Sequence, residues 1–380
     1  SEGFDLNGKP MIHRKTVHGN KKDAEVELAK FVTEVQNGLV IDGKSLKFSE
    51  FTEIWKRDYG SKELAPSTYK RYCRMLETRL LPYFGHFYIN KIKPTDIMKF
   101  YDLLEKDTQL VRKKGNNGSK TKKPLSGKTI LEHHRLLRAM LHKAVYWQLI
   151  VANPAERVQP PKARKPKRRS YDDEQTKILI ENLELLPSED TKYKVAIILT
   201  VFTGVRLGEL MGLEWQDVDF KNGIISINRS SQYLADMGVF TKVPKTESSI
   251  REIAIPEFII SLLEEYKLWY EEQKLIYGEL WMNSDRLFVQ VDGKPMHPST
   301  ISKWFVKYVC QIGLPVINFH GLRHTNASLL VAQNIDIAVI SARLGHAQIS
   351  TTLDFYVHPL LSHNRKAGYA LENLLLPTRS

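Results

Sequence analysis

The stretch that decides the fold is NFHGLRHTNASLLVAQNIDIAVISARLGHAQISTTLDFYVH, residues 318–358. Apolar residues recur at helical spacing in two runs, 327–331 and 337–344, and Gly345-His346 predicts a turn after the second run. A third helix is predicted after the Ser350-Thr351-Thr352 cluster, because hydroxyl side chains cap helix starts. We therefore expect three successive helices joined by short turns.

Four polar side chains of this stretch point to chemistry on a phosphodiester. His320 and Arg323 lie three residues apart, so a helix that starts near Asn318 places them on one face. His346 occupies the predicted turn, and Tyr356 lies near the end of the third helix. Together these groups can hold, protonate and attack a phosphodiester. Any one of them alone is more often a core or surface residue, since the chain has 12 His and 16 Tyr.

Composition indicates a polyanionic partner. The 380 residues predict two or three domains, and 56 Lys and Arg against 43 Asp and Glu give a net charge of +13. This excess favours nucleic acid. No apolar stretch approaches the roughly 20 residues that span a bilayer, so we expect no membrane contact. Cys73 and Cys310 fit reduced, buried thiols of a cytosolic protein.

The first half of the chain predicts a small mixed unit and then a helical domain. Residues 1–20 predict a β-hairpin and 21–37 a helix, a unit too small to hold much core, which suggests that its opening strands are missing. After a short linker at 43–45, a helical domain is predicted up to residue 158. Apolar periodicity places its helices near 48–59, 67–80, 95–105 and 127–147.

Two helix starts and two basic segments of this half are candidate phosphate contacts. Hydroxyls and free backbone amides at helix starts bind anions. Residues 159–169, QPPKARKPKRR, predict an extended basic linker that suits wrapping around a duplex, although composition is also compatible with a nuclear-localisation address. A charged loop is most often merely solvated. The candidates are Ser67, Thr68, Lys128 and Thr129 at the helix starts, Lys113, Lys114, Lys120 and Lys122 in a loop, and Lys162, Arg164, Lys165, Lys167 and Arg168 in the linker.

The second half predicts helices around a small antiparallel sheet. Gly204 ends one helix and Arg206 begins the next, where Glu209 could orient it; a purely structural ion pair is the alternative. Alternating residues predict strands at 223–228, 233–241 and 251–255, with Lys245 in the turn before the last strand. The remaining helices are predicted at 170–185, 191–203, 256–275 and 298–311, with a hairpin at Asp292-Gly293 and a tail helix at 362–376.

These residues stand in motifs that resemble those of the tyrosine recombinases, and within them the phage and mobile-element integrases. The motifs are TGVRLGEL with Arg206, PKTESSIR with Lys245, HGLRH with His320 and Arg323, LGH with His346, and TTLDFY with Tyr356. The resemblance implies a multidomain, mainly α protein with a mixed α/β catalytic domain. It implies a partial arm-type DNA-binding domain at 1–42, a helical core-binding domain at 43–158, a basic linker at 159–169 and a catalytic domain with a tail helix at 170–380.

The resemblance also implies a role for each residue. Arg206 and Arg323 would hold the nonbridging phosphate oxygens, and Tyr356 would attack to give a 3′-phosphotyrosine. His320 would assist that proton transfer, Lys245 would protonate the leaving 5′ oxygen, and His346 would hydrogen-bond the phosphate. No metal and no other cofactor is implied.

The implied partners are double-stranded DNA at attachment-site cores and three further copies of the chain, a tetramer on paired sites that passes through a Holliday junction. An accessory factor would set direction. We expect the protein in the cytoplasm of a bacterial host, associated with the nucleoid.

Three other functions stay open at this point. A type IB topoisomerase uses similar residues but relaxes supercoils without paired sites. A non-catalytic DNA-binding regulator would keep the basic character and predicts a gap in the residue set. A metal hydrolase built on His320, His324 and His346 would be sensitive to chelators. The tail helix either packs on its own domain or is donated to a neighbouring subunit.

Overall fold

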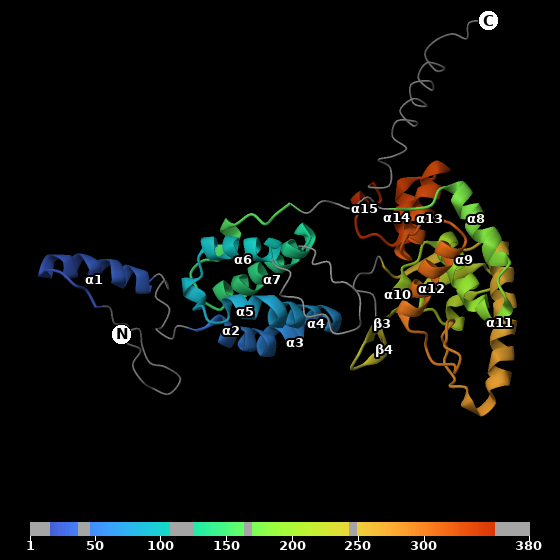
Figure 1. Ribbon diagram of the computed structural model, residues 1–380, viewed down its shortest axis with the longest axis horizontal. Coiled ribbons are helices and arrows are strands. Elements are labelled where there is room, and N and C mark those ends of the chain that lie inside the picture. The colour runs from blue at the N-terminus through green and yellow to red at the C-terminus, as the bar shows by residue number, and fades with distance from the viewer. Residues whose placement is uncertain (1–15, 37–45, 107–124, 163–168, 243–248, 354–380) are drawn as a thin grey trace, which may run out of the picture. The chain divides into compact units, whose positions relative to one another are not determined.

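The computed structural model describes residues 16–36, 46–106, 125–162, 169–242 and 249–353. The chain divides into two compact units, Ser1–Pro166 (unit 1) and Lys167–Ser380 (unit 2) (Figure 1). The division falls inside the segment predicted as the basic linker. Both units are mainly helical and unit 2 also contains small antiparallel sheets, which confirms the predicted fold class.

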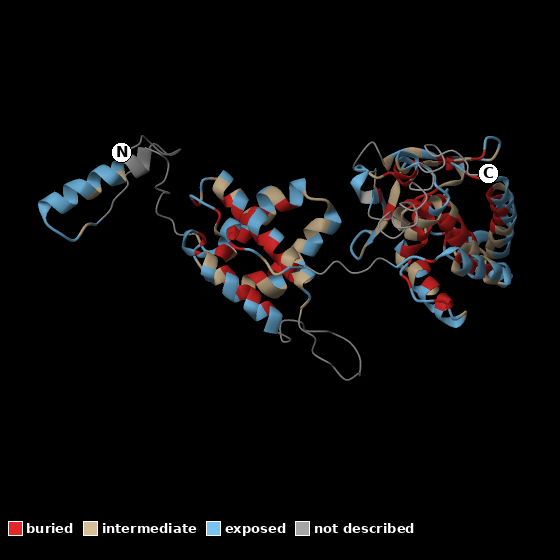
Figure 2. Cartoon of the chain, turned by 90° about the horizontal axis from the view of Figure 1, so that it is seen from above, coloured by how far each residue is buried: buried red, intermediate tan, exposed pale blue. Residues whose placement is uncertain are grey.

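The first helix of unit 1, α1 (Lys21–Gln36), agrees with the prediction for 21–37. Asn20 caps its start, because the Asn20 side-chain oxygen accepts from the backbone amide of Asp23 at 3.0 Å. Leu28 and Val32 of the predicted apolar stripe are exposed, as is most of the helix surface in Figure 2. The predicted hairpin at 1–20 falls almost entirely outside the described residues.

The rest of unit 1 is a helical bundle. Its helices are α2 (Phe48–Trp55), α3 (Ser61–Glu63), α4 (Pro66–Met75), α5 (Leu81–Phe84), α6 (Pro94–Lys106) and α7 (Gly127–Tyr146). Shorter turns are η1 (Lys56–Gly60), η2 (Leu76–Leu80), η3 (Ile89–Lys91) and η4 (Pro154–Arg157). The four predicted helices are confirmed, with the difference that the first two continue through the π-helical turns η1 and η2.

Aromatic and aliphatic side chains together form the core of this bundle, and Figure 2 colours the inward faces of its helices as buried. The rings of Phe84 and Phe100, for example, lie 5.1 Å apart in a tilted arrangement that suits aromatic pairs. On the surface, Arg71 of α4 forms an ion pair of 3.2 Å with Glu132 of α7. Arg71 lies about one helical turn after Ser67 and Thr68, and Glu132 lies about one turn after Lys128 and Thr129. The two candidate helix starts therefore lie in the same part of the unit 1 surface.

Unit 2 is built around one buried helix. Its helices are α8 (Asp173–Glu184), α9 (Thr191–Thr203), α10 (Leu207–Leu210), α11 (Glu257–Tyr277), α12 (Pro298–Gln311), α13 (His320–Ala332), α14 (Ile337–Leu344) and α15 (Ser350–Leu353). Shorter turns are η5 (Ser188–Asp190), η6 (Trp215–Asp217) and η8 (Gly278–Leu280). Helix α9 is apolar on nearly every side and packs against α11, α12 and α13, which fits a helix at the centre of a domain.

The strands form two separate sheets rather than one. Strands β1 (Val218–Asp219), β2 (Ile224–Ile227) and β5 (Arg251–Ala254) pair antiparallel in the order β1-β2-β5, while β3 (Ser230–Leu234) and β4 (Gly238–Lys242) form a hairpin. The predicted single strand at 233–241 is therefore wrong. The chain reverses there because Gly238 takes a φ of +68° and the Met237 amide bonds the Leu234 carbonyl at 3.1 Å. Alternating polarity alone does not reveal such a reversal.

Two smaller expectations have different outcomes. The Asp292-Gly293 turn is confirmed by the Gln290 amide, which donates to the Lys294 carbonyl at 2.7 Å. The expectation of buried thiols is wrong, because Cys310 is exposed and Cys73 only half-buried. Within the described ranges, no helix is both long and apolar enough to cross a membrane.

Candidate functional site

The junction between α9 and α10 positions Arg206. Gly204 ends α9 in the left-handed conformation with a φ of +67°, as the sequence predicted. Arg206 then caps α10 in an extended conformation, and its backbone amide donates to Glu209 Oε2 at 2.9 Å. This is half of a capping box, with the acidic residue three positions after the cap. The local sequence therefore fixes the backbone of Arg206 before any distant contact is made.

The Arg206 side chain is held by one carboxylate and one distant carbonyl. Its guanidinium donates to Glu209 Oε1 at 2.7 Å, which confirms the predicted contact between the two residues. A second nitrogen donates to the backbone carbonyl of Gly345, 139 positions away, at 2.8 Å. The side chain remains 36 % exposed, so part of the guanidinium stays accessible to a ligand.

Three consecutive carbonyls at the end of α14 each accept from a different arginine. The carbonyl of Arg343 accepts from Arg251 Nε at 2.7 Å, that of Leu344 from Arg323 at 2.7 Å, and that of Gly345 from Arg206 at 2.8 Å. The last carbonyls of a helix have no partner within it and carry its negative dipole end, so they favour cations. The end of α14 thus gathers three guanidinium groups in one place.

Arg323 is the most buried of these arginines, at 2 % exposed. Its other guanidinium nitrogen donates to the Gly204 carbonyl at 2.8 Å, which ties α13 to the end of α9. Burial, and after it the positive charge of Arg206, lowers the pKa of Arg323 to about 9. A bound anion would offset both effects, so the site favours a negatively charged ligand.

His346 follows directly on the three carbonyls. Gly345 ends α14 in the left-handed conformation with a φ of +66°, as the predicted turn requires. His346 Nδ1 and the hydroxyl of Thr352 share a hydrogen bond of 2.7 Å. Helix α15 begins at Ser350, the first residue of the predicted hydroxyl cluster, and Thr352 of that cluster orients a candidate site residue.

His320 opens α13. The helix begins two residues after the predicted Asn318, whose side-chain oxygen accepts from the Gly321 amide at 2.9 Å. His320 is exposed, and its ring meets that of His324 edge-on with centroids 4.7 Å apart. In the described part of the chain no group of three or more His, Cys, Asp or Glu residues could hold a metal ion, so His320, His324 and His346 do not form such a group.

Gly204 is closely packed at the junction between α9 and α10, and its replacement tests this packing. An added Cβ would lie 2.4 Å from Leu344 Cδ2 and 2.7 Å from Asn326 Oδ1. Gly313 also has a positive φ, +74°, but an added Cβ there meets nothing within 4 Å. We expect Gly313→Ala to cost about 1–2 kcal/mol from backbone strain alone. We expect Gly204→Ala to cost about 1–3 kcal/mol more from overpacking. Urea unfolding of both variants measures the difference, and equal losses would contradict the packing described here.

The structure brings together part of the predicted catalytic set. Arg206, Arg323 and His346 meet at the end of α14, and His320 lies three residues before Arg323 on α13. Lys245 and Tyr356 fall outside the described residues.

Among the candidate DNA contacts, Ser67, Lys128 and Lys162 are exposed. The Thr129 amide donates to the Ser126 hydroxyl at 3.2 Å, so this amide already caps its own helix. Thr68 is half-buried. The remaining candidates fall outside the described residues: Lys113, Lys114, Lys120, Lys122, Arg164, Lys165, Lys167 and Arg168.

Sequence reasoning missed Arg251. This residue pairs with Ile227 at the start of β5 and shares a strand face with the buried Ile253, because side chains alternate along a strand. An arginine on the inward face of a strand requires a buried partner, and that was the available signal.

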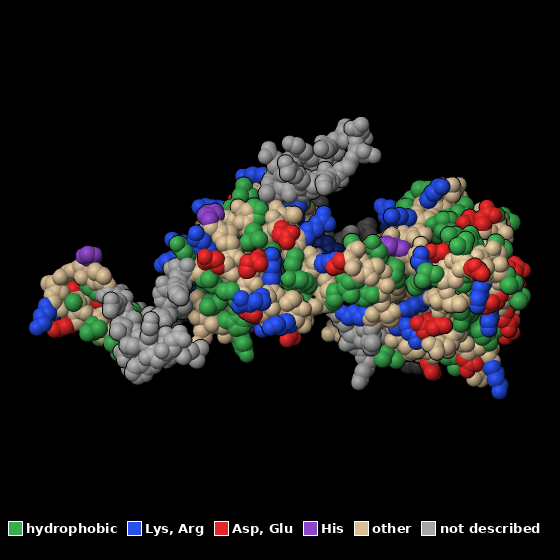
Figure 3. Space-filling view, turned by 90° about the horizontal axis from the view of Figure 1, so that it is seen from below, with side chains coloured by type: hydrophobic (Ala, Val, Ile, Leu, Met, Phe, Trp, Pro, Cys, Tyr) green, Lys and Arg blue, Asp and Glu red, His purple; other side chains and the backbone are tan. Residues whose placement is uncertain are grey.

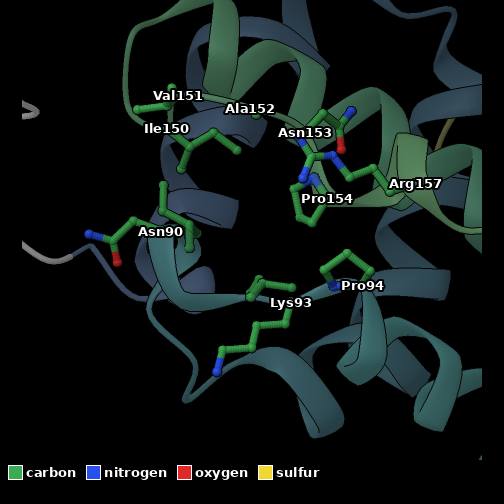
Figure 4. Close-up of a pocket in the computed structure, with 11 residues that line it drawn as sticks. Asn90, Lys93, Pro94, Ile150, Val151, Ala152, Asn153, Pro154 and Arg157 are labelled. Carbon is green, nitrogen blue, oxygen red and sulfur yellow. The ribbon is translucent and has the colours of Figure 1, made fainter. Parts of the chain in front are cut away.

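A pocket of about 470 Å³ lies in unit 1 (Figure 4). Lys93 and Arg157 line it from opposite sides. None of the predicted catalytic or DNA-contact residues lines it, so it is separate from the candidate site.

Comparison with known proteins places this geometry in a family. A model described as the phage integrase family matches residues 169–363, just over half of the 380 residues, and one described as the phage integrase N-terminal SAM-like domain matches 47–104. A XerC-like tyrosine recombinase from Caldanaerobacter subterraneus subsp. tengcongensis is 26 % identical, over 98 % of this chain and 95 % of the relative. The ICEBs1 integrase of Bacillus subtilis is 27 % identical, over 99 % and 96 %.

Solved structures share the fold. The Tn1549 transposon integrase in complex with transposon right end DNA superposes with a TM-score of 0.69 at 21 % identity, covering 86 % of this chain and 99 % of that one. A lambda integrase dimer bound to a core site gives a TM-score of 0.56 at 15 % identity, covering 82 % and 95 %. With more than half of its length matched by one family model, the chain belongs to the phage integrase family.

Proposed function

We propose that the protein is a site-specific DNA recombinase that cleaves and rejoins strands through a 3′-phosphotyrosine, and so integrates and excises a mobile element. The observation that carries the proposal is the gathering of Arg206, Arg323 and His346 at the end of α14. Two guanidinium groups beside an imidazole form a site for a phosphodiester. The relatives named tyrosine recombinase and integrase support the same activity.

In the proposed reaction Tyr356 is the nucleophile. Its phenolic oxygen forms a bond to phosphorus while the bond from phosphorus to the 5′ oxygen breaks. The phenol proton passes to His320, and Lys245 gives a proton to the leaving 5′ oxygen. The ester keeps the bond energy, so a 5′ hydroxyl from another strand can reverse the step and exchange partners.

The two arginines stabilise the charge that develops on the nonbridging oxygens. A guanidinium is planar and can bind two oxygens at once, and it acts most strongly where water is excluded. Arg323 is buried and Arg206 partly exposed. We infer that Arg206 meets the phosphate directly and that Arg323 completes its binding as the DNA closes the site. His346, oriented by Thr352, would donate the remaining hydrogen bond.

Unit 1 would bind the duplex by its phosphates. The starts of α4 and α7, with Ser67, Thr68, Lys128 and Thr129, lie near the Arg71–Glu132 ion pair and so in one surface region. Figure 3 shows Lys and Arg side chains over the visible face of this unit, interspersed with Asp and Glu. Exposed Lys162 and the basic linker residues would add contacts whose strength falls with salt.

We further propose that the active assembly is a tetramer on paired attachment cores in a bacterial cytoplasm, with an accessory factor that sets direction. Solved integrases of this fold in complex with DNA support the DNA partner. The tail helix predicted at 362–376 lies outside the described residues.

A nicked suicide duplex tests the proposal. The duplex carries the junction sequence of the element that encodes the protein, and the nick lets the 5′ end diffuse away after cleavage. We expect a protein–DNA adduct that survives denaturant and forms equally in the presence of a chelator. Binding without an adduct would favour the regulator, and cleavage lost with the chelator would favour the metal hydrolase. Relaxation of supercoiled plasmids that lack the site would favour the topoisomerase.

A further inference from the structure

The geometry points to Arg251 as a positioning residue for strand cleavage, one that orients Arg206 through Glu209 and through the end of α14. This inference rests on the proposed recombinase function. Arg251 lies in β5 and is the last residue of the PKTESSIR motif, to which the resemblance assigned no role. Its side chain is 7 % exposed, so it acts from behind the site rather than on the DNA.

Arg251 contacts both groups that hold the Arg206 side chain, which are the Glu209 carboxylate and the backbone at the end of α14. One terminal nitrogen donates to Glu209 Oε2 at 2.9 Å, and Nε donates to the Arg343 carbonyl at 2.7 Å. The other terminal nitrogen donates to the Ser249 carbonyl at 3.1 Å, which ties the guanidinium to the segment just before its own strand. A planar fork with donors in fixed directions can satisfy three such acceptors at once, whereas a lysine ammonium cannot reach them with the same geometry.

The first support is the Glu209 carboxylate. Its Oε1 accepts from the Arg206 guanidinium, and its Oε2 accepts from the Arg206 amide and from Arg251. Burial by itself raises the pKa of Glu209, but the hydrogen bond and charge of Arg251, followed by those of Arg206, outweigh it and lower the pKa below 4.5. The carboxylate therefore stays charged and fixed between two arginines.

Charge compensation follows from this sharing. Glu209 is buried and carries one negative charge between two positive groups. If Arg251 lost its contact with Glu209, Arg206 would be, among the described residues, the only guanidinium paired with the Glu209 charge. The attraction of Arg206 for a phosphate would then decrease, although no atom of Arg206 had changed.

The second support is the end of α14. The Arg343 carbonyl held by Arg251 is followed directly by the carbonyls that hold Arg323 and Arg206, and then by His346. Each peptide unit is planar, and the Gly345 and His346 amides donate to the Ala342 and Ser341 carbonyls, so a shift of the first carbonyl is passed to the next two. Arg251 thus fixes three candidate site residues through one backbone segment.

Single-turnover cleavage of the suicide duplex by Arg251→Lys tests the inference. The rate is measured at saturating DNA and divided by the amount of protein bound, so unfolded molecules do not enter it. We expect a loss of about 10- to 100-fold, the range typical when an outer hydrogen-bond partner of a reactive group is removed. The affinity for the duplex should stay near that of the wild type.

The matched control is Arg229→Lys. Arg229 is another largely buried arginine of unit 2 that pairs with carboxylates, Glu214 at 2.9 Å and Asp217. The contacts found for Arg229 do not include Arg206, Glu209 or α14. We expect its replacement to lower the melting temperature as much as Arg251→Lys does while leaving the cleavage rate per bound protein nearly unchanged.

A double-mutant cycle of Arg251→Lys with Glu209→Gln tests whether Arg251 acts on Arg206 through Glu209. Because Arg251 acts in part through Glu209, the loss of rate in the double variant should be smaller than the product of the two single losses. Losses that multiply fully would overturn this inference, and so would an Arg251→Lys rate equal to that of Arg229→Lys. In either case an adduct formed by the wild-type protein would leave the recombinase proposal unaffected. Absence of an adduct with the wild-type protein would instead overturn the recombinase proposal, and this inference with it.

Discussion

Tyr356→Phe will abolish the covalent protein–DNA adduct while leaving DNA affinity almost unchanged. The substitution removes one oxygen, and in the proposed mechanism that oxygen is the only atom that bonds to phosphorus. Loss of a nucleophile has cost on the order of 10⁶-fold in a well-studied hydrolase, so the adduct should fall below detection. Denaturing electrophoresis of the suicide duplex measures it.

The control for this prediction is binding of the same duplex, measured by gel shift. One phenolic hydroxyl contributes little to an interface dominated by phosphate contacts, so the gel shift should match the wild type. An adduct that persists in Tyr356→Phe would mean that another residue is the nucleophile.

Arg206→Ala should reduce the rate of adduct formation by at least about 10²- to 10³-fold, the loss typical for one preorganised donor at a developing negative charge. The guanidinium is aimed by Glu209 and by the Gly345 carbonyl, yet part of it remains accessible. Binding should weaken only modestly, because one of many phosphate contacts is lost. Single-turnover rates at saturating DNA separate these two effects.

Arg206→Lys is the matched variant, since it keeps the charge and loses the fork. If the bidentate geometry matters, this variant should recover binding but little of the rate. Near wild-type cleavage by Arg206→Ala would contradict the placement of this residue at the phosphate.

The helices were predictable from sequence because their signals are local. The interval 191–203 is strongly apolar from Val195 onward and Gly204 ends it, so the bounds of α9 were predicted to the residue. The contact between Arg206 and Glu209 was predictable for the same reason, a spacing of three residues at a helix start.

The supports of the site depend on contacts between distant segments, which local patterns do not encode. The Gly345 carbonyl meets Arg206 across 139 residues, and the Leu344 carbonyl meets Arg323 across a turn and a helix. A backbone carbonyl is present at every position, so no residue type marks the ones that are used. The reversal between β3 and β4 escaped prediction because the residues on both sides of it continue one alternating pattern.

In the proposed reaction the phenolic oxygen of Tyr356 forms an ester with a DNA 3′ phosphate at a site that contains Arg206 and Arg323. Mass spectrometry of the protease-digested adduct tests it most directly, because it identifies both the modified residue and the end of the DNA. We predict one peptide that carries a 3′-phosphonucleotide on Tyr356, in equal yield with and without a chelator. A nucleotide linked to another residue, or linked through its 5′ phosphate, would contradict this account.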